Sequence, residues 1–423
     1  MDTIFALSSG RPPAAIAVVR VSGPGAGLAL ETLGGPKPAA REAKLRVLRD
    51  AGGEILDRAM VLWLPGPDSA TGEDTAELFL HGGAAVIRSV EGALAKLDGL
   101  RKAEPGEFTR RAFANGRIDL AEAEGLAELL EAETELQRRH ALAMAGGALS
   151  RQVGLWRDVV LDLSAQVESA LDFSDEDDVD ELPAAFSGQV SDLASEIGQW
   201  LDRPRAERLR EGYRVVLAGP PNAGKSTLFN ALIEDEAAIA TPIPGTTRDV
   251  LERSVSLEAV PFTFVDTAGL RDASDDEIEI IGIERARAQA AGADCVLWLG
   301  PEGEGPDGAW EIATKLDLDE CAKGDAAFRV SAIRGDGMDK LRAALIEHAR
   351  KSMPAPGSVA LNARQADLVA QLHTALVAID VASDPLIVGE NLRSARRALD
   401  ALVGHTSTED MLDALFGRFC IGK

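Results

Sequence analysis

The sequence predicts a multidomain α/β protein, in which an α+β domain precedes an all-helical domain that is interrupted by a doubly wound α/β domain. Three observations support this fold class. The chain has 423 residues, and a single hydrophobic core stops growing at roughly 250 to 300 residues, so about two to three domains are expected. Helical spacing of apolar residues begins near residue 121, and strands alternate with helices between residues 213 and 352.

Residues 1–120 are expected to form the α+β domain. Short apolar runs, such as IAVVRV from Ile16 and MVLWLP from Met60, alternate there with glycine and proline turns. Runs of this length and composition are typical of strands. The segment ends near NGRIDL, after which the periodicity changes.

Residues 121–212 and 353–423 are expected to be helical. Apolar residues recur there every three or four positions, as in LWRDVVLDLSAQV and NLRSARRALDALV. The acidic tract DFSDEDDVDEL, which begins at Asp172, indicates a solvated helix end or loop without a metal site. Since helical segments flank residues 213–352 on both sides, one discontinuous helical domain with an inserted α/β domain is predicted.

Residues 213–352 alternate between strands and helices. The expected order is strand YRVVLAG, helix KSTLFNALIE, strand PFTFVD, a helical stretch from Ile281, strands ADCVLWLG and FRVSA, and a last helix from Met338. This alternation is typical of a doubly wound α/β domain.

The composition restricts the function and the compartment. The excess of 69 acidic over 44 basic residues gives a formal charge of -25, which repels nucleic-acid backbones, so a local patch or a partner must hold any such substrate. The 3 cysteines are too few for a disulfide framework or a four-ligand zinc site. Without a signal peptide or a run of about 18 apolar residues, a cytoplasmic protein with no membrane segment is expected.

The segment GPPNAGKST, which begins at Gly219, matches the phosphate-binding P-loop pattern between a predicted strand and a predicted helix. Backbone N–H groups of such a turn surround phosphate oxygens, a lysine neutralises the β- and γ-phosphates, and a serine binds Mg²⁺. A glycine-rich turn that only joins strand to helix is the alternative, and the motifs that follow disfavour it. The candidate nucleotide contacts are Asn222, Ala223, Gly224, Lys225, Ser226 and Thr227, with Ser226 on Mg²⁺ and Lys225 in a catalytic role.

Two further segments have the spacing of nucleotide-sensing switches. TPIPGTTRD lies between the P-loop helix and DTAG, and DTAG follows the strand PFTFV, where a carboxylate near Mg²⁺ and a glycine that senses the γ-phosphate are required. Thr247 is the expected second Mg²⁺ ligand. The candidates in these segments are Thr241, Pro242, Ile243, Pro244, Gly245, Thr246, Thr247, Asp266, Thr267, Ala268 and Gly269.

The segment TKLD, Thr314 to Asp317, stands where an Asn-Lys-x-Asp motif would read the base. The Asp317 carboxylate can accept from guanine N1–H and the 2-amino group, donors that adenine lacks, so GTP is favoured over ATP. Threonine has a shorter reach than asparagine, which can donate to guanine and brace the phosphate loop, so one or two hydrogen bonds are expected to be lost. The base-site candidates are Thr314, Lys315, Asp317, Ser331 and Ala332.

The residue after DTAG is Leu270, where many small GTPases carry the glutamine that orients the attacking water. The acidic segment that follows offers Glu277 and Glu279 for that task. The alternative is that both are solvated acidic positions at a helix start.

Taken together, these motifs resemble the MnmE/TrmE family of tRNA-modification GTPases. The likeness extends to DTIFALSSGRPPAAIAVVRVSGP near the N-terminus, AEPGEFTRRAFANGRIDLAEAE from Ala103, and the closing FGRFCIGK. The resemblance implies a homodimer joined through N-terminal domains and a hetero-oligomer with a flavoprotein of the MnmG/GidA type, which would supply the FAD and hold most of the tRNA. It also implies carboxymethylaminomethyl or aminomethyl addition at C5 of the wobble uridine 34, with 5-formyl- or 5,10-methylene-tetrahydrofolate as the one-carbon donor.

The same resemblance assigns roles to individual residues. It makes Glu279 the carboxylate that orients the water, and it places Cys420 near the folate site, although a small buried hydrophobe is an equally good interpretation of this cysteine. The folate contacts that it implies are Arg20, Glu77, Arg117 and Lys423, with Arg117 at a position where the family usually has lysine. The potassium contacts that it implies are Asn222, Thr241, Ile243 and Thr246.

Two other functions fit parts of the sequence. One is a ribosome- or RNA-assembly GTPase that uses the nucleotide as a switch, but such proteins usually carry a basic RNA-binding module, and this acidic chain shows none. The other is a folate-dependent one-carbon transferase with a regulatory GTPase. Analysis of modified nucleosides in tRNA distinguishes these alternatives.

Overall fold

The computed structural model describes residues 2–172, 182–234, 251–266, 292–318, 323–380, 382–406 and 409–422. The chain divides into two compact units. The first contains Met1–Ala127, Leu149–Gly154 and Leu399–Lys423, and the second contains Glu128–Ala148 and Leu155–Ala398. None of the described helices combines the length and apolar character needed to span a bilayer.

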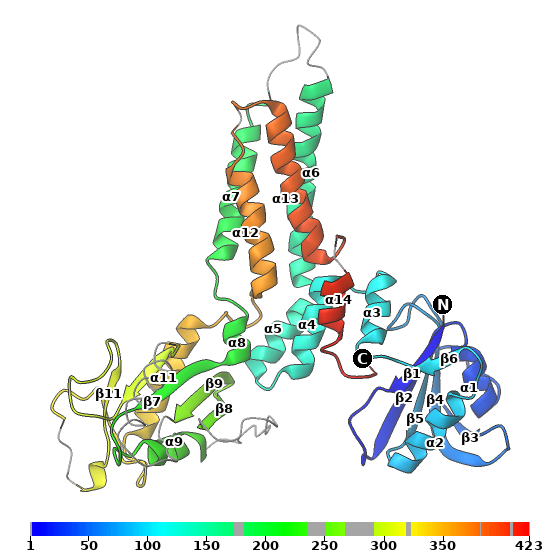
Figure 1. Cartoon of the computed structure of the whole chain (residues 1–423), viewed down its shortest axis with the longest axis horizontal. Helices are drawn as coiled ribbons and strands as arrows, with labels where there is room; N and C mark the ends of the chain where they lie inside the picture. Colours follow the sequence, from blue (N-terminus) through cyan, green and yellow to red (C-terminus); the bar gives the residue numbers. More distant parts are fainter. Residues whose placement is uncertain are drawn as a thin grey trace. The chain divides into compact units, whose positions relative to one another are not determined.

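The first unit is built on a mixed sheet with the strand order β3-β4-β5-β2-β1-β6 (Figure 1). Neighbouring strands are antiparallel, except that β6 runs parallel to β1. The strands are β1 (Thr3–Leu7), β2 (Ile16–Ser22), β3 (Lys44–Arg49), β4 (Ile55–Leu64), β5 (Thr75–His81) and β6 (Leu100–Lys102).

Helices α1 (Ala26–Gly34) and α2 (Ala84–Leu94) cover one face of this sheet. Side chains alternate between the faces of a strand, so every second residue of β2 and β5 points toward these helices. The buried residues on this face include Val19, Val21, Ala76, Leu78, Leu30 and Val90. Arg20 and Glu77 lie between them in sequence and therefore face the other way.

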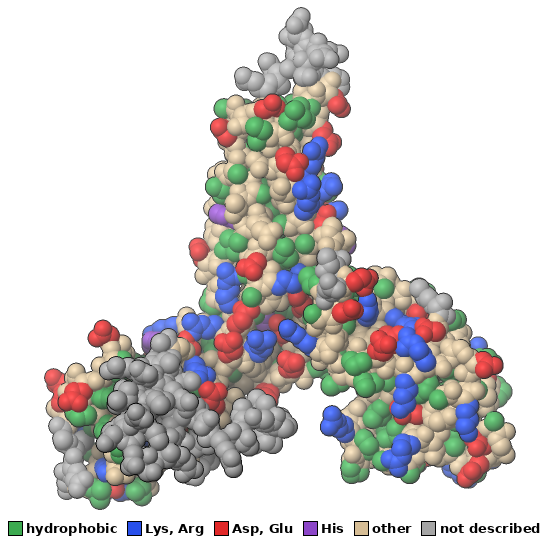
Figure 2. Space-filling view, viewed as in Figure 1, with side chains coloured by type: hydrophobic (Ala, Val, Ile, Leu, Met, Phe, Trp, Pro, Cys, Tyr) green, Lys and Arg blue, Asp and Glu red, His purple; other side chains and the backbone are tan. Residues whose placement is uncertain are grey.

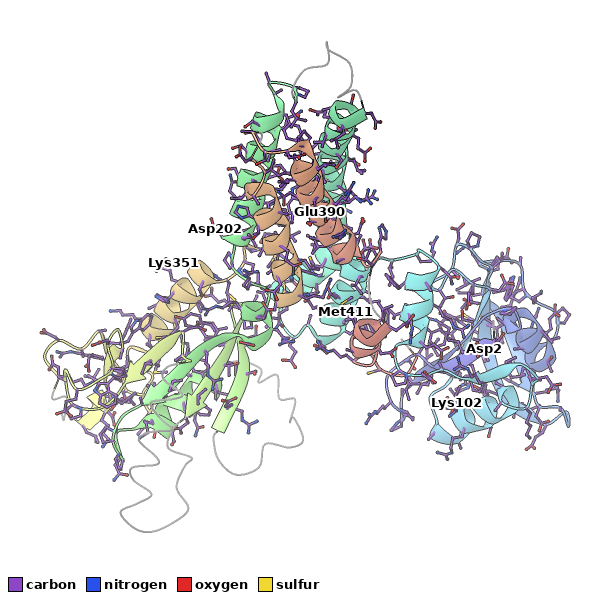
Figure 3. All side chains as sticks on the ribbon, turned by 45° about the horizontal axis from the view of Figure 1, so that its top comes forward. Asp2, Lys102, Asp202, Lys351, Glu390 and Met411 are labelled. Atoms are coloured by element: carbon purple, nitrogen blue, oxygen red, sulfur yellow. The ribbon has the colours of Figure 1, made fainter. Side chains whose placement is uncertain are left out.

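The opposite face of the sheet meets α3 (Glu107–Ala114), where Phe108 packs with Ile4, Ala6 and Ala103. The C-terminal helix α14 (Glu409–Phe416) packs in the same unit against the start of α4 (Leu120–Glu131), and Figure 3 labels Met411 on it. Gly106 has a φ of 69°. A Cβ added there would lie 2.1 Å from the Phe416 carbonyl oxygen, so glycine permits this close approach.

The second unit contains a group of long helices that lie side by side in Figure 1. They are α6 (Ala148–Asp172), α7 (Phe186–Leu201), α12 (Ala363–Val377) and α13 (Pro385–Val403), and the shorter helices α5 (Glu135–Ala145) and α8 (Glu207–Glu211) accompany them. Trp156 of α6 and Trp200 of α7 pack edge to face with ring centroids 5.2 Å apart. This arrangement gives the helices a shared apolar seam, as the three- and four-residue spacing predicts.

The same unit contains a second sheet, with the order β12-β11-β10-β7-β9-β8. Among these strands only β8 is antiparallel to its neighbour. The elements are β7 (Tyr213–Ala218), α9 (Lys225–Glu234), β8 (Leu251–Leu257), β9 (Val260–Asp266), β10 (Cys295–Trp298), β11 (Trp310–Ala313), β12 (Phe328–Arg329) and α11 (Met338–Ser352). The carboxyl ends of parallel strands share one edge of a sheet, which is where ligands bind in open α/β folds.

The predicted fold class is confirmed, and individual elements differ in detail. The strand expected at FRVSA contains only Phe328–Arg329, because the chain turns at Ser331, whose N–H bonds Asp336 O at 2.9 Å. The short strand β11 was not predicted from its four residues, WEIA. The helical stretch expected from Ile281 lies outside the described residues, as does most of the acidic tract. The expected domain limits at residues 120, 212 and 352 stay predictions.

Candidate functional site

The P-loop connects the end of β7 to the start of α9. Gly219 and Gly224 have φ angles of 147° and 95°, and Asn222 has a φ of 60°. A Cβ at Gly219 would lie 2.9 Å from Gly300 N, so the first glycine is required by space as well as by backbone conformation. A tight turn that leads into a helix N-terminus presents backbone N–H groups to an anion.

Lys225 is held in this loop by the loop's own backbone. The side chain is 7% exposed, and Nζ donates to Gly219 O at 2.7 Å and to Pro220 O at 2.8 Å. These carbonyl oxygens keep the ammonium group beside the residues that are expected to surround the phosphates. The contact of Lys225 with the β- and γ-phosphates stays a prediction.

Ser226 and Asp266 come from α9 and from the end of β9. Ser226 Oγ donates to Asp266 Oδ2 at 2.7 Å, and Asp266 is fully buried. Magnesium prefers oxygen ligands and retains several waters, which a neighbouring carboxylate can orient. A serine hydroxyl beside a buried carboxylate fits these requirements, so Ser226 could serve as a ligand and Asp266 could hold a ligated water.

The base-reading candidates form two hydrogen bonds. Thr314 Oγ1 donates to Ala223 O at 2.7 Å, and Ser331 Oγ donates to Asp317 Oδ1 at 2.7 Å. The Ser331 hydroxyl lowers the pKa of the Asp317 carboxyl below its ordinary value, and the residue's own backbone N–H adds to the effect. Asp317 is therefore held as a carboxylate, the form that accepts from guanine.

Several predicted residues lie outside the described part of the chain, and their roles stay predictions. They are the switch residues Thr241, Pro242, Ile243, Pro244, Gly245, Thr246 and Thr247, the DTAG residues Thr267, Ala268 and Gly269, the carboxylates Glu277 and Glu279, and the terminal Lys423. Among the four proposed potassium contacts, only Asn222 is described.

The first unit brings together two of the predicted folate residues. Arg20 and Glu77 are direct neighbours across β2 and β5. Arg20 Nε donates to Glu77 Oε1 at 3.0 Å, and their side chains are only 21% and 14% exposed. Phe108 lies against the Arg20 guanidinium, with 5.7 Å from Cζ to the ring centroid. A half-buried ion pair beside an aromatic ring can bind a flat, polar heterocycle.

Arg117 occupies a different position. Its guanidinium lies 3.6 Å from Asp68 Oδ1 and is 41% exposed, so it is available to a carboxylate of an extended ligand. The C-terminal tail reaches the same unit, because Ile421 pairs with Pro105. Gly422 lies so close to β1 that an added Cβ would be 2.0 Å from Leu7 O.

The cysteines differ in environment. Burial raises the pKa of the Cys295 thiol to about 12, so it is not a nucleophile at neutral pH. Cys420 is exposed. The interpretation of Cys420 as a small buried hydrophobe is therefore wrong.

Sequence reasoning missed two features of these sites. Phe108 was not expected beside Arg20, although it belongs to the EPGEFTRRAF segment that supports the family resemblance. Ser331 was named only as a base-site candidate, and the hydrogen bond from its hydroxyl to Asp317 was not predicted. The sequence did contain a signal for the Ser331–Asp317 hydrogen bond, because a serine hydroxyl can donate to a carboxylate that lies near it.

Comparison with known proteins covers almost the whole chain. A family model described as the TrmE N-terminus of a GTP-binding protein matches residues 3–117, and a model of the MnmE helical domain matches residues 120–420. A solved Era structure from Aquifex aeolicus, bound to GDP and AlF4, covers 40% of this chain at 22% identity with a TM-score of 0.24, and it adds nothing to the family assignment.

Two curated relatives, both named tRNA modification GTPase MnmE, are similar over their entire lengths. The protein from Erythrobacter litoralis is 64% identical, with 100% of each chain covered. The protein from Novosphingobium aromaticivorans is 63% identical, again with 100% of each chain covered. The chain therefore belongs to the MnmE family of tRNA modification GTPases.

Proposed function

We propose that this chain hydrolyses GTP to drive modification of C5 of the wobble uridine 34 in tRNA, together with a flavoprotein partner of the MnmG/GidA type. Family membership makes it a GTP-hydrolysing enzyme. The observation that supports GTP hydrolysis is the convergence of the P-loop, the Ser226–Asp266 pair and Asp317 at the carboxyl ends of parallel strands. The proposal of tRNA modification rests on the names of the MnmE relatives.

In the proposed mechanism, the P-loop backbone and Lys225 bind the β- and γ-phosphate oxygens and offset the charge that develops as the terminal phosphoryl group leaves. Ser226 and Thr247 would hold a magnesium ion, with Asp266 beside Ser226, and the ion would supply further neutralisation of the phosphate charge. Glu279 positions the attacking water. Asn222 would help to hold a potassium ion, which would supply the positive charge that an arginine finger provides in many GTPases.

The base preference follows from Asp317, whose carboxylate complements the N1–H and 2-amino donors of guanine. We expect Asp317→Asn to shift binding from GTP toward XTP, because the 2-oxo group of xanthine requires a donor. Competition titrations with GTP, XTP and ATP measure this shift. Unchanged base preference would show that TKLD does not read the base.

Potassium dependence is proposed from Asn222, whose positive φ turns the loop at the position that the family resemblance assigns to the ion. Hydrolysis should therefore be faster in KCl than in NaCl at equal ionic strength. Steady-state turnover in the two salts tests this, and equal rates exclude a potassium site.

Folate binding is proposed for the Arg20–Glu77 site. Calorimetry with 5-formyltetrahydrofolate measures it directly. Glu77 supplies an acceptor for pterin donors, and Arg117 supplies a cation for the carboxylates of the folate tail. Absence of binding to the intact protein would contradict this assignment.

A homodimer is proposed through exposed apolar side chains of β3 and β4, on the face of the first sheet that α3 meets elsewhere. Leu45 is 72% exposed and lies opposite Met60, which is 42% exposed, and Met60 lies opposite Phe79. Such an apolar row supports self-association. Leu45→Glu should produce monomers in light scattering, whereas Leu142→Glu, at another exposed apolar position, should leave dimers.

The partner is proposed to hold most of the tRNA, because this chain is strongly acidic. On the face shown in Figure 2, acidic side chains lie among the basic ones. The decisive experiment is nucleoside analysis of tRNA from a strain that lacks the gene. Loss of the C5 substituent at uridine 34 supports the proposal. If the amount of the C5 substituent is unchanged and ribosome assembly is defective, the switch-GTPase alternative is favoured.

A further inference from the structure

The hydroxyl of Thr314 donates its only proton to the P-loop. Thr314 Oγ1 donates to Ala223 O in the P-loop at 2.7 Å. A hydroxyl carries one donor and two acceptor lone pairs. Once the proton is engaged with the loop, the side chain can offer only lone pairs to any group on its other side.

The backbone around Thr314 restricts movement of this hydroxyl. Strand β11 ends one residue before it, and Val330 N bonds Ala313 O at 2.8 Å. Leu316 N bonds Val330 O at 3.3 Å on the other side. A Cβ added at Gly224 would lie 3.6 Å from Thr314 Oγ1, which confirms that the hydroxyl packs on the loop. Thr314 thus braces the P-loop from the end of the central sheet.

Asp317 keeps enough capacity for guanine. A carboxylate has about four lone-pair sites, and the bond from Ser331 Oγ uses one on Oδ1. The N1–H and 2-amino donors of guanine can use the others. The rest of the guanine edge carries O6 and N7, and both are acceptors.

Guanine N7 is an acceptor, so it gains no hydrogen bond from the lone pairs of Thr314 Oγ1. We propose that residue 314 braces the phosphate loop without reading guanine N7, so that this site binds nucleotides with a carbon in place of N7 as well as it binds GTP. This inference rests on the proposed guanine-nucleotide site and defines its substrate class more closely. Base recognition depends on Asp317 and the Watson–Crick edge, and the imidazole edge of the base is not selected.

The experiment compares GTP with 7-deaza-GTP on the full-length protein. Both compete against a fluorescent GDP analogue in the presence of Mg²⁺, with ATP as a third competitor. We expect the two guanine nucleotides to bind wild type with the same Kd. A hydrogen bond is worth about a 5-fold change in Kd, so 7-deaza-GTP binding more weakly than GTP by about 5-fold or more would overturn the inference.

The variant Thr314→Asn sharpens the comparison, because an amide has two donors and can brace the loop and reach N7. It should bind GTP about 5-fold more tightly while 7-deaza-GTP is unchanged. The variant Thr314→Val keeps the shape and removes the brace, so it should weaken both nucleotides by one common factor. A loss confined to GTP in this variant would mean that the hydroxyl does read N7.

The result also separates this inference from the proposed function. If ATP displaces the probe as well as both guanine nucleotides do, the guanine site itself is wrong. If GTP alone displaces it, the guanine site stands and the inference about N7 fails.

Discussion

The nucleotide site and the Arg20–Glu77 site are assembled in different ways. In the nucleotide site, Lys225 is bound by carbonyl oxygens only five and six residues away in the chain. In the first unit, 57 residues separate Arg20 from Glu77, and they meet because β2 pairs with β5. A consecutive motif thus fixes the first site locally, whereas the second exists only after the sheet has formed.

The difference extends to the charges. Lys225 is an almost buried cation whose Nζ donates to the neutral carbonyl oxygens of Gly219 and Pro220, and a phosphate would add negative charge beside it. Arg20 and Glu77 already neutralise each other. Loss of Lys225 should therefore remove a cation that faces the charged phosphates, whereas a change at Arg20 or Glu77 leaves the other member of the pair without its partner.

The largest effect expected from this contrast is at Lys225. We predict that Lys225→Ala lowers GTP hydrolysis by about 1,000-fold, a factor typical of one lost charge-stabilising group in a transition state. Single-turnover hydrolysis measures it. Lys351→Ala is the matched control, because Lys351 lies on the surface of α11 and pairs with Glu347 (Figure 3). Equal rates for the two variants would contradict the role of Lys225.

The next largest effect is expected at Glu279, which is proposed to position the attacking water in the reaction that Lys225 also supports. Glu279→Ala should lower kcat by about 100-fold with little change in nucleotide affinity, because a group that positions water acts in the transition state. Glu277→Ala is the control. If the control is the slower enzyme, the water-orienting carboxylate has been assigned to the wrong position.

A smaller effect is expected at the N-terminal site. Glu77→Gln keeps the shape and removes the charge that accepts from a pterin and from Arg20, so affinity for 5-formyltetrahydrofolate should fall by about 10-fold. Calorimetry measures the loss. Glu54→Gln, on an exposed turn of the same sheet, should bind normally. Hydrolysis of GTP in the absence of tRNA should be unchanged in both variants, and a loss there would show that the two sites are not separate.

The contrast also explains what the sequence could predict. The P-loop, its flanking strand and its helix were predictable because each follows from local pattern: apolar residues in β7, glycines at positive φ, and helical spacing in α9. The fold class followed from the same periodicities. The pairing of Arg20 with Glu77 depends on strand order, and no periodicity in one strand specifies its neighbour.

The base-reading segment falls between these cases. TKLD was located by its place after the central strands, and the sequence left open whether threonine loses one hydrogen bond or two. The structure shows that the bond to the P-loop is retained through Ala223 O. Which acceptor a hydroxyl chooses depends on the three-dimensional approach of two loops, so the sequence alone could not decide it.

The smallest effect tests the bond between Ser331 and Asp317. The Ser331 hydroxyl holds the pKa of Asp317 below its ordinary value, so guanine recognition should be complete above the ordinary carboxyl range and fall only as the pH drops through that lowered pKa. Ser331→Ala removes the main cause of the shift. GTP affinity at neutral pH should weaken by about 5-fold, as expected for one lost hydrogen bond that orients the carboxylate. The loss of affinity on acidification should also begin at a higher pH than in wild type, because the Asp317 pKa returns toward its ordinary value.

Nucleotide titrations across the acidic range measure both changes, with Ser358→Ala as the control on a linker far from the base site in sequence. An acid limb that moves to lower pH in Ser331→Ala would contradict the direction of the shift and the role of this hydroxyl.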